Sequence, residues 1–258
     1  MKKIKLSSLS LSFGLALGIS TSLSFLSLSV QAEQSIKYNA PSGATQTEHT
    51  LKSRGPSRGP SRGPSRGPSR GACSTIDQDF ILKVLVPGMG HTISEQPNLY
   101  WSNSQAVSGP VVFTLKPVVL DPNSFDFPDP LIDTKPLTIS VPAGIQTLSL
   151  AEYNVKLALN KEYEWSVSLI CDPYNPSLNI FATGRIKRVS PSANLNQALK
   201  QANQTQFPYL CAENGIWYDA LDKLSQSIQK RPSDRSLRQV RASLLRQGGL
   251  KSVAAFDL

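Results

Sequence analysis

A strict alternation of apolar and polar residues over residues 162–171 constrains the fold more than any other feature of this sequence. The two sets are Tyr163, Trp165, Val167, Leu169 and Cys171, and Glu162, Glu164, Ser166 and Ser168. Successive side chains of a β-strand point to opposite faces of its sheet, so one set is buried and the other is exposed. The pattern therefore predicts a β-strand whose aromatic face lies in a core.

Other short runs of strand-forming residues lie on both sides of this segment, separated by Pro, Gly and Asn. They cover residues 80–86, 99–101, 111–119, 137–141, 147–150 and 180–189. About seven short strands with frequent turn signals are typical of a fold of two packed antiparallel sheets. We therefore predict that residues 73–190 form a mainly β domain, an antiparallel, immunoglobulin-like β-sandwich.

After residue 190 the apolar residues follow helical spacing. One predicted helix buries Trp217, Ala220, Leu221, Leu224 and Ile228, and the next buries Leu237, Val240, Leu244 and Leu245. The first is predicted to start at the Asn214 cap and to end before Pro232, and the second to start at the Ser233 cap and to stop at two glycines. A weaker helix is predicted over 193–202. Residues 191–258 are thus expected to form a C-terminal α-helical hairpin packed on the sandwich.

Residues 1–32 have the three parts of a secretory signal peptide. Lysines follow Met1, an apolar stretch runs from Leu6 to Val30, and small residues precede Glu33. An uncleaved membrane anchor is the alternative, because the stretch approaches the length of about 20 residues that spans a bilayer. Its many serines lower its hydrophobicity and favour the signal peptide. We expect cleavage after Ala32, export, and no transmembrane segment in the mature chain.

Residues 33–72 are predicted to be a disordered linker, or tether. Between residues 53 and 71 the unit Ser-Arg-Gly-Pro recurs, and proline at every fourth position blocks helix and sheet formation. The arginines of the repeats belong either to a spacer or to a contact with an anionic surface; they are Arg54, Arg58, Arg62, Arg66 and Arg70.

The net charge of +9 lies outside the predicted folded body. Lys52, the repeat arginines and the lysines of the signal peptide together carry a charge of +9, which equals the net charge of the whole chain. The folded body is therefore nearly neutral, and an exported protein is kept away from nucleic acid. No binding to DNA or RNA is expected.

Three cysteines occur in the chain. Cys73 opens the predicted domain and Cys171 ends the inward set of the strongest strand, which favours a disulfide between them with Cys211 left over. Pairings that use Cys211 stay open. In the chain-entropy view, closing a loop of about 100 residues stabilises a fold by up to about 4.7 kcal/mol. The spare Cys211 is either a reactive thiol before a helix or, the reading we favour, a small buried hydrophobe.

No motif in the sequence specifies a reaction, a metal or a nucleotide. The chain has two histidines, His49 in the linker and His91, which leaves no zinc-ligand spacing. A Ser-His-Asp or Cys-His arrangement would depend wholly on His91. The acidic run over 121–130 is interpreted as a solvated loop, with a calcium site as the alternative. The aromatic residues suited to stacking on a sugar are assigned to the core instead; they are Tyr100, Trp101, Trp165 and Trp217. We predict no catalytic, cofactor-binding or metal-binding residue and no cofactor.

Three blocks of the sequence form a recognisable set. They are Cys171-Asp172-Pro173, the run from Gly184 to Val189, and the run from Ala212 to Leu221 that contains Gly-Ile-Trp-Tyr-Asp-Ala-Leu. With the Arg-Gly-rich approach to Cys73, they resemble the cyanobacterial domain-of-unknown-function family DUF928, over residues 73–250. The resemblance implies export and a cyanobacterial host, and it implies no reaction. Cys211 stands where the family pattern leads us to expect an aromatic residue, which weakens a role for its thiol.

These observations predict an exported cell-envelope or secreted protein whose β-domain is a non-enzymatic binding or interaction module. Its partner would be an envelope protein or glycan, with an anionic surface contacted through the arginine repeats. The alternatives are an envelope hydrolase with carboxylates that the sequence does not identify, and a purely structural envelope protein. Two acids in a deep polar cleft would favour the hydrolase, and a flat aromatic or hydrophobic patch would favour the binding module.

Overall fold

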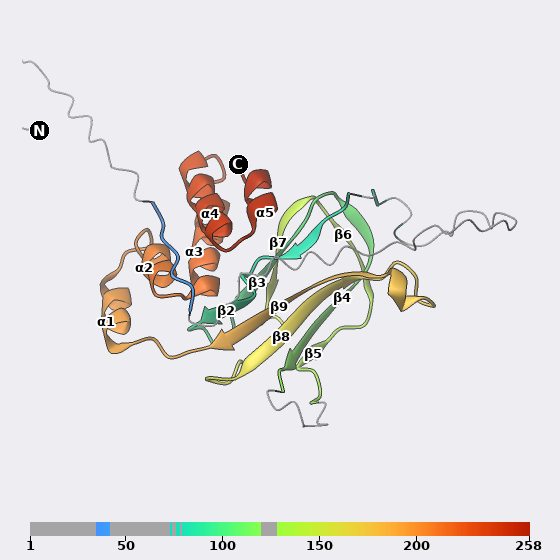
Figure 1. Cartoon of the computed structure of the whole chain (residues 1–258), viewed down its shortest axis with the longest axis horizontal. Helices are drawn as coiled ribbons and strands as arrows, with labels where there is room; N and C mark the ends of the chain where they lie inside the picture. Colours follow the sequence, from blue (N-terminus) through green and yellow to red (C-terminus); the bar gives the residue numbers. More distant parts are fainter. Residues whose placement is uncertain (1–34, 42–72, 74–75, 78, 120–127) are drawn as a thin grey trace, which may run out of the picture. The chain divides into compact units, whose positions relative to one another are not determined.

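The computed structural model describes residues 35–41, 73, 76–77, 79–119 and 128–258 (Figure 1). Its strands form two sheets. The smaller sheet has the order β1 (Leu82–Val84), β3 (Asn98–Asn103), β7 (Gly144–Ser149). The larger sheet has the order β2 (Met89–Thr92), β9 (Ile180–Arg188), β8 (Glu162–Leu169), β4 (Val107–Pro117), β5 (Ile132–Asp133), and β6 (Leu137–Val141) also pairs with β4. A short 3-10 turn, Pro176–Leu178, lies between β8 and β9.

The expectation of a mainly β domain with antiparallel sheets is confirmed, and the immunoglobulin-like topology is not. The pairs of the smaller sheet are antiparallel, as are those that β8 makes with β4 and β9. The outer strand β2 is parallel to β9, with Gly90 opposite Ile186. A long stretch of chain separates these two strands, so no hairpin fixes their relative direction. The alternation of side chains along a strand does not show whether its neighbour runs parallel or antiparallel.

Strand β8 forms the centre of the core. Its burial alternates along its whole length, with Tyr163, Trp165, Val167 and Leu169 buried and the residues between them partly exposed. This confirms the face that the sequence pattern assigns to the core. Tyr100, Trp101 and Trp217 are buried in the same core, as predicted.

A disulfide joins Cys73 to Cys171, and Cys211 is free and buried. Both outcomes confirm the predicted pairing. The bond fixes the start of the β-domain to the end of the β8 segment, at a sequence separation of 98 residues. Cys211 lies within a helix rather than before one.

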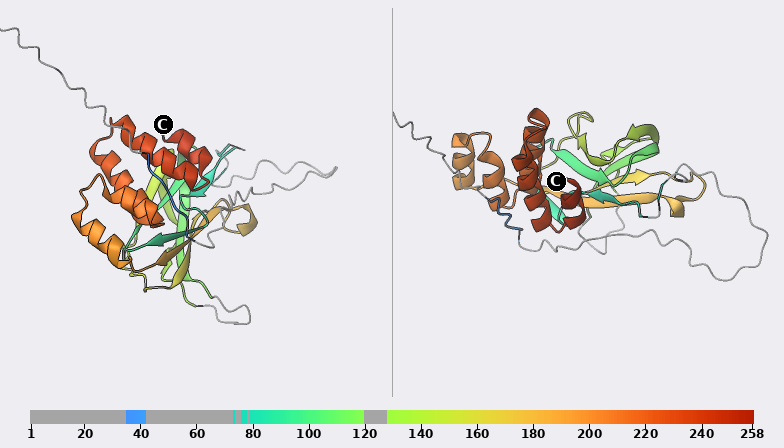
Figure 2. Two further views of the ribbon diagram at one scale, coloured as in Figure 1. Left: turned by 60° about the vertical axis from the view of Figure 1, so that its left-hand side comes forward. Right: turned by 90° about the horizontal axis from the view of Figure 1, so that it is seen from above.

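The C-terminal part of the chain contains more helices than the predicted hairpin. They are α1 (Ala193–Gln201), α2 (Phe207–Glu213), α3 (Trp217–Lys230), α4 (Arg235–Gln247) and α5 (Lys251–Phe256). Asn214 ends α2 and does not cap α3. The N-cap of α4 is Asp234, whose side chain accepts a hydrogen bond from the Ser236 amide, rather than Ser233. Figure 2 shows the helices gathered beside one end of the strands.

Helix α3 is the element that joins the helices to the sheets. Trp217 donates a hydrogen bond from Nε1 to the carbonyl of Leu85 at 2.7 Å. The hydroxyl of Tyr218 accepts from Trp165 Nε1 at 2.9 Å and donates to the carbonyl of Arg185 at 3.1 Å. These side chains belong to the Gly-Ile-Trp-Tyr-Asp-Ala-Leu block, so the block holds α3 against both sheets.

Residues 35–41 overturn part of the linker prediction. They form an extended strap, drawn in blue beside α2 and α3 in Figure 1, in which Ile36 and Tyr38 are 3% and 9% exposed. From the sequence, this segment was predicted to belong to a disordered linker. Two apolar residues in an otherwise polar stretch show no clear period, so the sequence pattern does not predict that this segment packs on helices distant in sequence.

Several predicted segments lie outside the described residues. They are the signal peptide (1–32), nearly all of the linker including Arg54, Arg58, Arg62, Arg66 and Arg70, and most of the acidic run (120–127). Among the residues that the structure does describe, no helix has the length and apolar character needed to cross a membrane.

Candidate functional site

A cavity of about 390 Å³ lies between the smaller sheet and helices α3, α4 and α5. Strands β3 and β7 supply one wall, and the three helices supply the other. Its lining is mixed in character. The apolar members include Ile81, Ile145, Ile228, Val253 and Phe256, and the uncharged polar members include Ser102, Asn103, Gln146, Thr147, Ser225 and Gln229.

Asn103, in the wall of this cavity, has a buried acceptor without a partner among the described residues. Its side chain is buried, and its Nδ2 donates to the carbonyls of Gln105 and Pro142, each at 2.8 Å. Those two bonds fix the orientation of the amide. The Oδ1 atom is buried and has no hydrogen-bond partner among the described residues, and the hydroxyl of Ser252 in the same lining is in the same state. An unmade hydrogen bond at a buried group costs about 1–3 kcal/mol. Because Oδ1 has almost no accessible surface, a ligand donor would recover that cost only after a small shift of the cavity wall.

A buried ion pair closes the inner side of the cavity. Arg241 on α4 donates from Nε to Asp257 Oδ2 at 2.7 Å and from Nη2 to Asp257 Oδ1, and its Nη1 donates to Ser225 Oγ at 3.1 Å. The bidentate pair leaves this part of the wall without net charge. Asp257 is the acidic residue of the lining, and both of its oxygens accept from Arg241.

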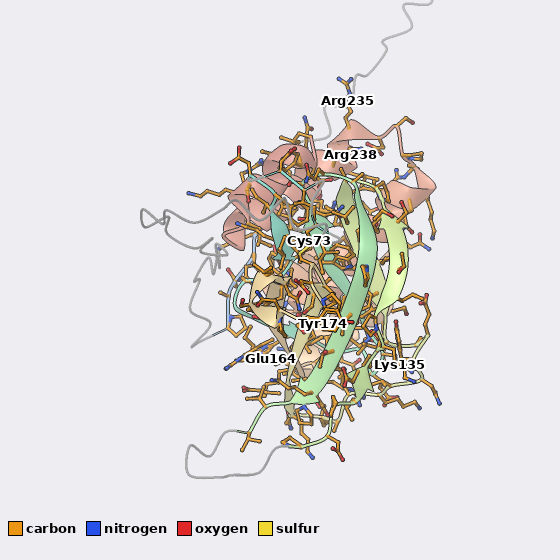
Figure 3. The ribbon with its side chains drawn as sticks, turned by 90° about the vertical axis from the view of Figure 1, so that its right-hand side faces the viewer. Cys73, Lys135, Glu164, Tyr174, Arg235 and Arg238 are labelled. Carbon is orange, nitrogen blue, oxygen red and sulfur yellow. A yellow bond between two sulfur atoms is a disulfide. The ribbon has the colours of Figure 1, made fainter. Side chains whose placement is uncertain are left out.

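Arg238 places a positive charge at the rim of the cavity. It lines the cavity from α4, and its Nη2 donates to the carbonyl of Pro232 at 2.9 Å, which is a bond to a neutral group. Figure 3 shows Arg235 close to Arg238 on the same helix. The net charge of the lining residues is therefore positive, so the rim favours an anionic or electron-rich ligand group.

Two aspartates of α3 hold the sheets to the helix from outside the cavity lining. Asp222 Oδ1 accepts from Tyr100 Oη at 2.7 Å and from Asn98 Nδ2 at 2.8 Å, and its Oδ2 accepts from Gln226. Burial first, and then the Asp222 carboxylate, raise the pKa of Tyr100. Tyr100 thus stays a neutral donor that fixes one edge of the cavity wall.

Asp219 makes the second of these attachments, at the end of β2. Its Oδ2 accepts from the hydroxyl of Thr92 at 2.7 Å and from the amide of Ile93 at 3.1 Å. Burial raises the pKa of Asp219 to about 6, although both hydrogen bonds favour the ionised form. In the first turn of α3 the helix dipole also favours the carboxylate. The group therefore changes charge in a mildly acidic range.

Asp219 is expected to make the stability of the fold depend on pH. The folded chain keeps the Asp219 proton up to about pH 6, whereas an unfolded aspartate releases it near pH 3.9. The stabilisation is present below about pH 4 and is lost as the pH rises through 6, a change of about 3 kcal/mol. Urea unfolding at pH 4, 5, 6 and 7 should show this contribution as a difference between wild type and Asp219→Asn. Identical pH dependence in the two proteins would contradict the assignment.

The structure does not bring the remaining sequence candidates together. Cys211 is fully buried, and burial raises the pKa of its thiol, so the favoured reading as a small hydrophobe is confirmed. His91 on β2 lies opposite Lys187 on β9, and burial and then Lys187 lower its pKa. Within the described residues no group of three His, Cys, Asp or Glu side chains is placed to hold a metal ion.

Sequence reasoning did not find the cavity, for a physical reason. Its lining comes from two strands, the neighbouring loops and three helices, and most of its members are ordinary Ser, Thr, Asn, Gln and Ile residues. Such residues carry no motif. Arg241 offered the one available signal, because it stands within the buried face of a predicted helix, where a charged side chain needs a partner.

The fold and the cavity define a class of protein: a disulfide-linked, β-rich domain with an attached helical layer and a ligand-sized hollow between the two. The chain belongs to the family described as Domain of Unknown Function (DUF928), whose model matches residues 61–258. The match includes the disulfide, α3 and every residue that lines the cavity. A comparison with curated proteins found no match.

Proposed function

We propose that this protein is an exported, non-enzymatic binding protein of the cell envelope or the secreted fraction, and that the cavity between the smaller sheet and α3–α5 is its ligand site. The observation that carries the proposal is the buried Oδ1 of Asn103, an acceptor without a partner among the described residues, in a cavity of about 390 Å³. Ligand sites generally combine an apolar lining with a few convergent polar groups, and this cavity has both.

Export is supported by two independent features. The first 32 residues have the charged, apolar and small-residue parts of a signal peptide. The Cys73–Cys171 disulfide is the kind of bond that persists in oxidising compartments. The resemblance noted from the sequence adds a cyanobacterial host to the proposal.

The size and chemistry of the cavity favour a small part of a larger partner. At about 390 Å³ it lies near the lower end of the range for small-ligand sites, about 300–1,000 Å³. One or two residues of a glycan or of a peptide fill such a space. A hydroxyl or N–H group would donate to Asn103, and a carboxylate or another electron-rich group would lie toward Arg238. The arginine repeats (Arg54, Arg58, Arg62, Arg66 and Arg70) would add an anionic surface contact that does not depend on the cavity.

The cavity does not favour the hydrolase alternative. A hydrolase that uses two carboxylates needs one carboxyl to donate a proton and another to act as nucleophile or base. Asp257, the acid of the lining, has both oxygens bound by Arg241. Asp219 and Asp222 do not line the cavity, and both accept hydrogen bonds that hold α3 to the sheets.

A cavity-blocking variant tests the proposal. Thr147 and Gln229 are exposed residues of the lining, so Thr147→Trp and Gln229→Trp narrow the cavity without disturbing the core. Thr183→Trp, at an exposed threonine of β9 away from the cavity, is the matched control. Immobilised mature protein is incubated with envelope glycans and peptides, and retained components are identified by mass spectrometry. We expect wild type and the control to retain the same component, and both cavity variants to lose at least about ten-fold. Equal retention by all four proteins would refute the proposal.

A further inference from the structure

The strap formed by residues 35–41 is bound the way a peptide ligand is bound. Exposure alternates along it, with Ile36 and Tyr38 directed inward and Ser35, Lys37 and Asn39 directed outward. This is the period-two pattern of an extended peptide lying in a groove. The groove is formed by α2, the turn that leads into α3, and α4.

The main chain of the strap is recognised by hydrogen bonds from the groove. Gln247 on α4 accepts from the Tyr38 amide and donates to the Ile36 carbonyl, each at 2.8 Å. One side chain therefore pairs with a main-chain donor and a main-chain acceptor of the strap. The Asn39 amide donates to the Ala212 carbonyl at 3.1 Å. Asn39 Nδ2 donates to the Glu213 carbonyl at 2.7 Å. Main-chain bonds of this kind accept any extended peptide, and the Asn39 side chain adds a sequence preference.

The inward side chains add further specificity. The Tyr38 ring contacts Trp217 edge to face, with 4.8 Å between ring centroids. Gly215, with φ of +73°, lets the strap approach, because a Cβ atom there would lie 2.8 Å from the Asn39 carbonyl oxygen. The Tyr38 hydroxyl is buried without a hydrogen-bond partner among the described residues, and burial raises its pKa to about 12. The pocket is therefore shaped for an aromatic ring and makes no use of the hydroxyl.

The family model covers the groove but not the strap that occupies it. The family match begins at residue 61, so it contains the groove residues Ala212, Gly215, Trp217 and Gln247 but not the strap. The groove belongs to the matched fold, while the strap is supplied by this chain through residues 42–72. A segment held to its site by a short flexible linker has an effective concentration on the order of millimolar.

We propose that this groove is a second binding site, for an extended peptide of a partner that carries a β-branched aliphatic residue, any residue, an aromatic residue and an asparagine in succession. The chain's own residues 35–41 are its intramolecular ligand. While the connection is intact, a free peptide must reach millimolar concentration to compete. Once the connection is cut, the same peptide binds according to its own dissociation constant.

The test uses the full mature chain with a specific protease site inserted after Thr45. The intact and cut proteins are titrated with a fluorescein-labelled peptide of residues 33–42, and binding is followed by fluorescence anisotropy. Near-UV circular dichroism monitors the fold, and tryptophan emission reports exposure of Trp217. We expect the cut strap to dissociate on dilution, the fold to remain, and the peptide to bind one to one with an apparent affinity at least about 30-fold higher than for the intact chain.

Peptide variants separate recognition from nonspecific adhesion. Lys37→Ala, at an exposed position of the strap, should bind like the parent peptide. Tyr38→Ala should lose binding at least about ten-fold, and Tyr38→Phe should bind at least as tightly as the parent. The proposal is overturned if the fold is lost when the strap leaves, if the cut strap cannot be exchanged, if the parent peptide fails to bind the cut protein, or if Tyr38→Ala binds as well as the parent.

Discussion

Replacing Trp217 with alanine is expected to lower the free energy of unfolding by about 3–5 kcal/mol, the usual cost of removing a large buried aromatic ring. The Trp217 side chain is 0% exposed, and it contacts Leu85, Tyr38 of the strap and Gly248 at the end of α4. Its Nε1 donates to the Leu85 carbonyl, which would lose its partner. A Cβ atom at Gly248 would lie 2.3 Å from Cη2 of the ring, so the chain after α4 is fitted to this indole.

Chemical unfolding followed by far-UV circular dichroism measures this effect. Tyr174→Ala is the control, because Tyr174 is 96% exposed and its removal leaves no cavity. We expect the midpoint of the control to stay at the wild-type value and that of Trp217→Ala to fall. A wild-type midpoint in the Trp217 variant would mean that α3 does not depend on this ring, and that the family block has a role other than attaching the helix.

The parts of the fold that sequence predicted are those in which one local pattern dominates. The alternation along β8 and the helical spacing of α3 each place one face in the core, and burial in the structure follows them. In α4 the predicted Leu244 and Leu245 are buried, whereas Leu237 and Val240 are only partly buried. The Cys73–Cys171 bond was predicted from the inward direction of Cys171 on a chain that was expected to be exported. For the strand and the helices the pattern lies within a single element, so it is visible in one stretch of sequence.

The parts that sequence did not predict depend on contacts between elements. The parallel direction of β2, the docking of residues 35–41 and the cavity each arise from segments far apart in the chain. The start of α3 was misplaced because Asn214 is a good N-cap residue by type, but it closes α2 instead. α2 and α5 are too short, at seven and six residues, for a helical period to stand out.

The contacts between elements also explain the Gly-Ile-Trp-Tyr-Asp-Ala-Leu block. Gly215 admits the strap, Trp217 and Tyr218 bond to the sheets, and Asp219 bonds to the end of β2. These residues have the composition of an active-site motif, yet each has a structural partner. The block therefore marks the junction between sheets and helices, and the cavity and the strap groove lie on either side of that junction.

Breaking the Arg241–Asp257 pair is expected to have the second large effect. Both side chains are buried, and the pair ties α4 to the end of α5 while Ser225 adds a contact to α3. Asp257→Asn keeps the shape of the side chain but leaves the guanidinium buried without its counter-charge. Removing one member of a buried pair costs about 3–5 kcal/mol, since the remaining charge stays desolvated.

A double variant and an exposed pair make the result specific. In Arg241→Met with Asp257→Leu the buried charges are both absent, so most of the lost stability should return, because apolar replacement of a buried pair is often neutral. Lys116 and Glu164, 3.1 Å apart across β4 and β8, form the control pair, and Glu164 is labelled in Figure 3. Its change Glu164→Gln should alter the unfolding free energy by no more than about 1 kcal/mol, as is usual for exposed pairs. The single and double variants are compared by urea unfolding at low and high salt. If Asp257→Asn costs no more than Glu164→Gln, then α5 is not held by this pair, and the inner wall of the cavity is free to open.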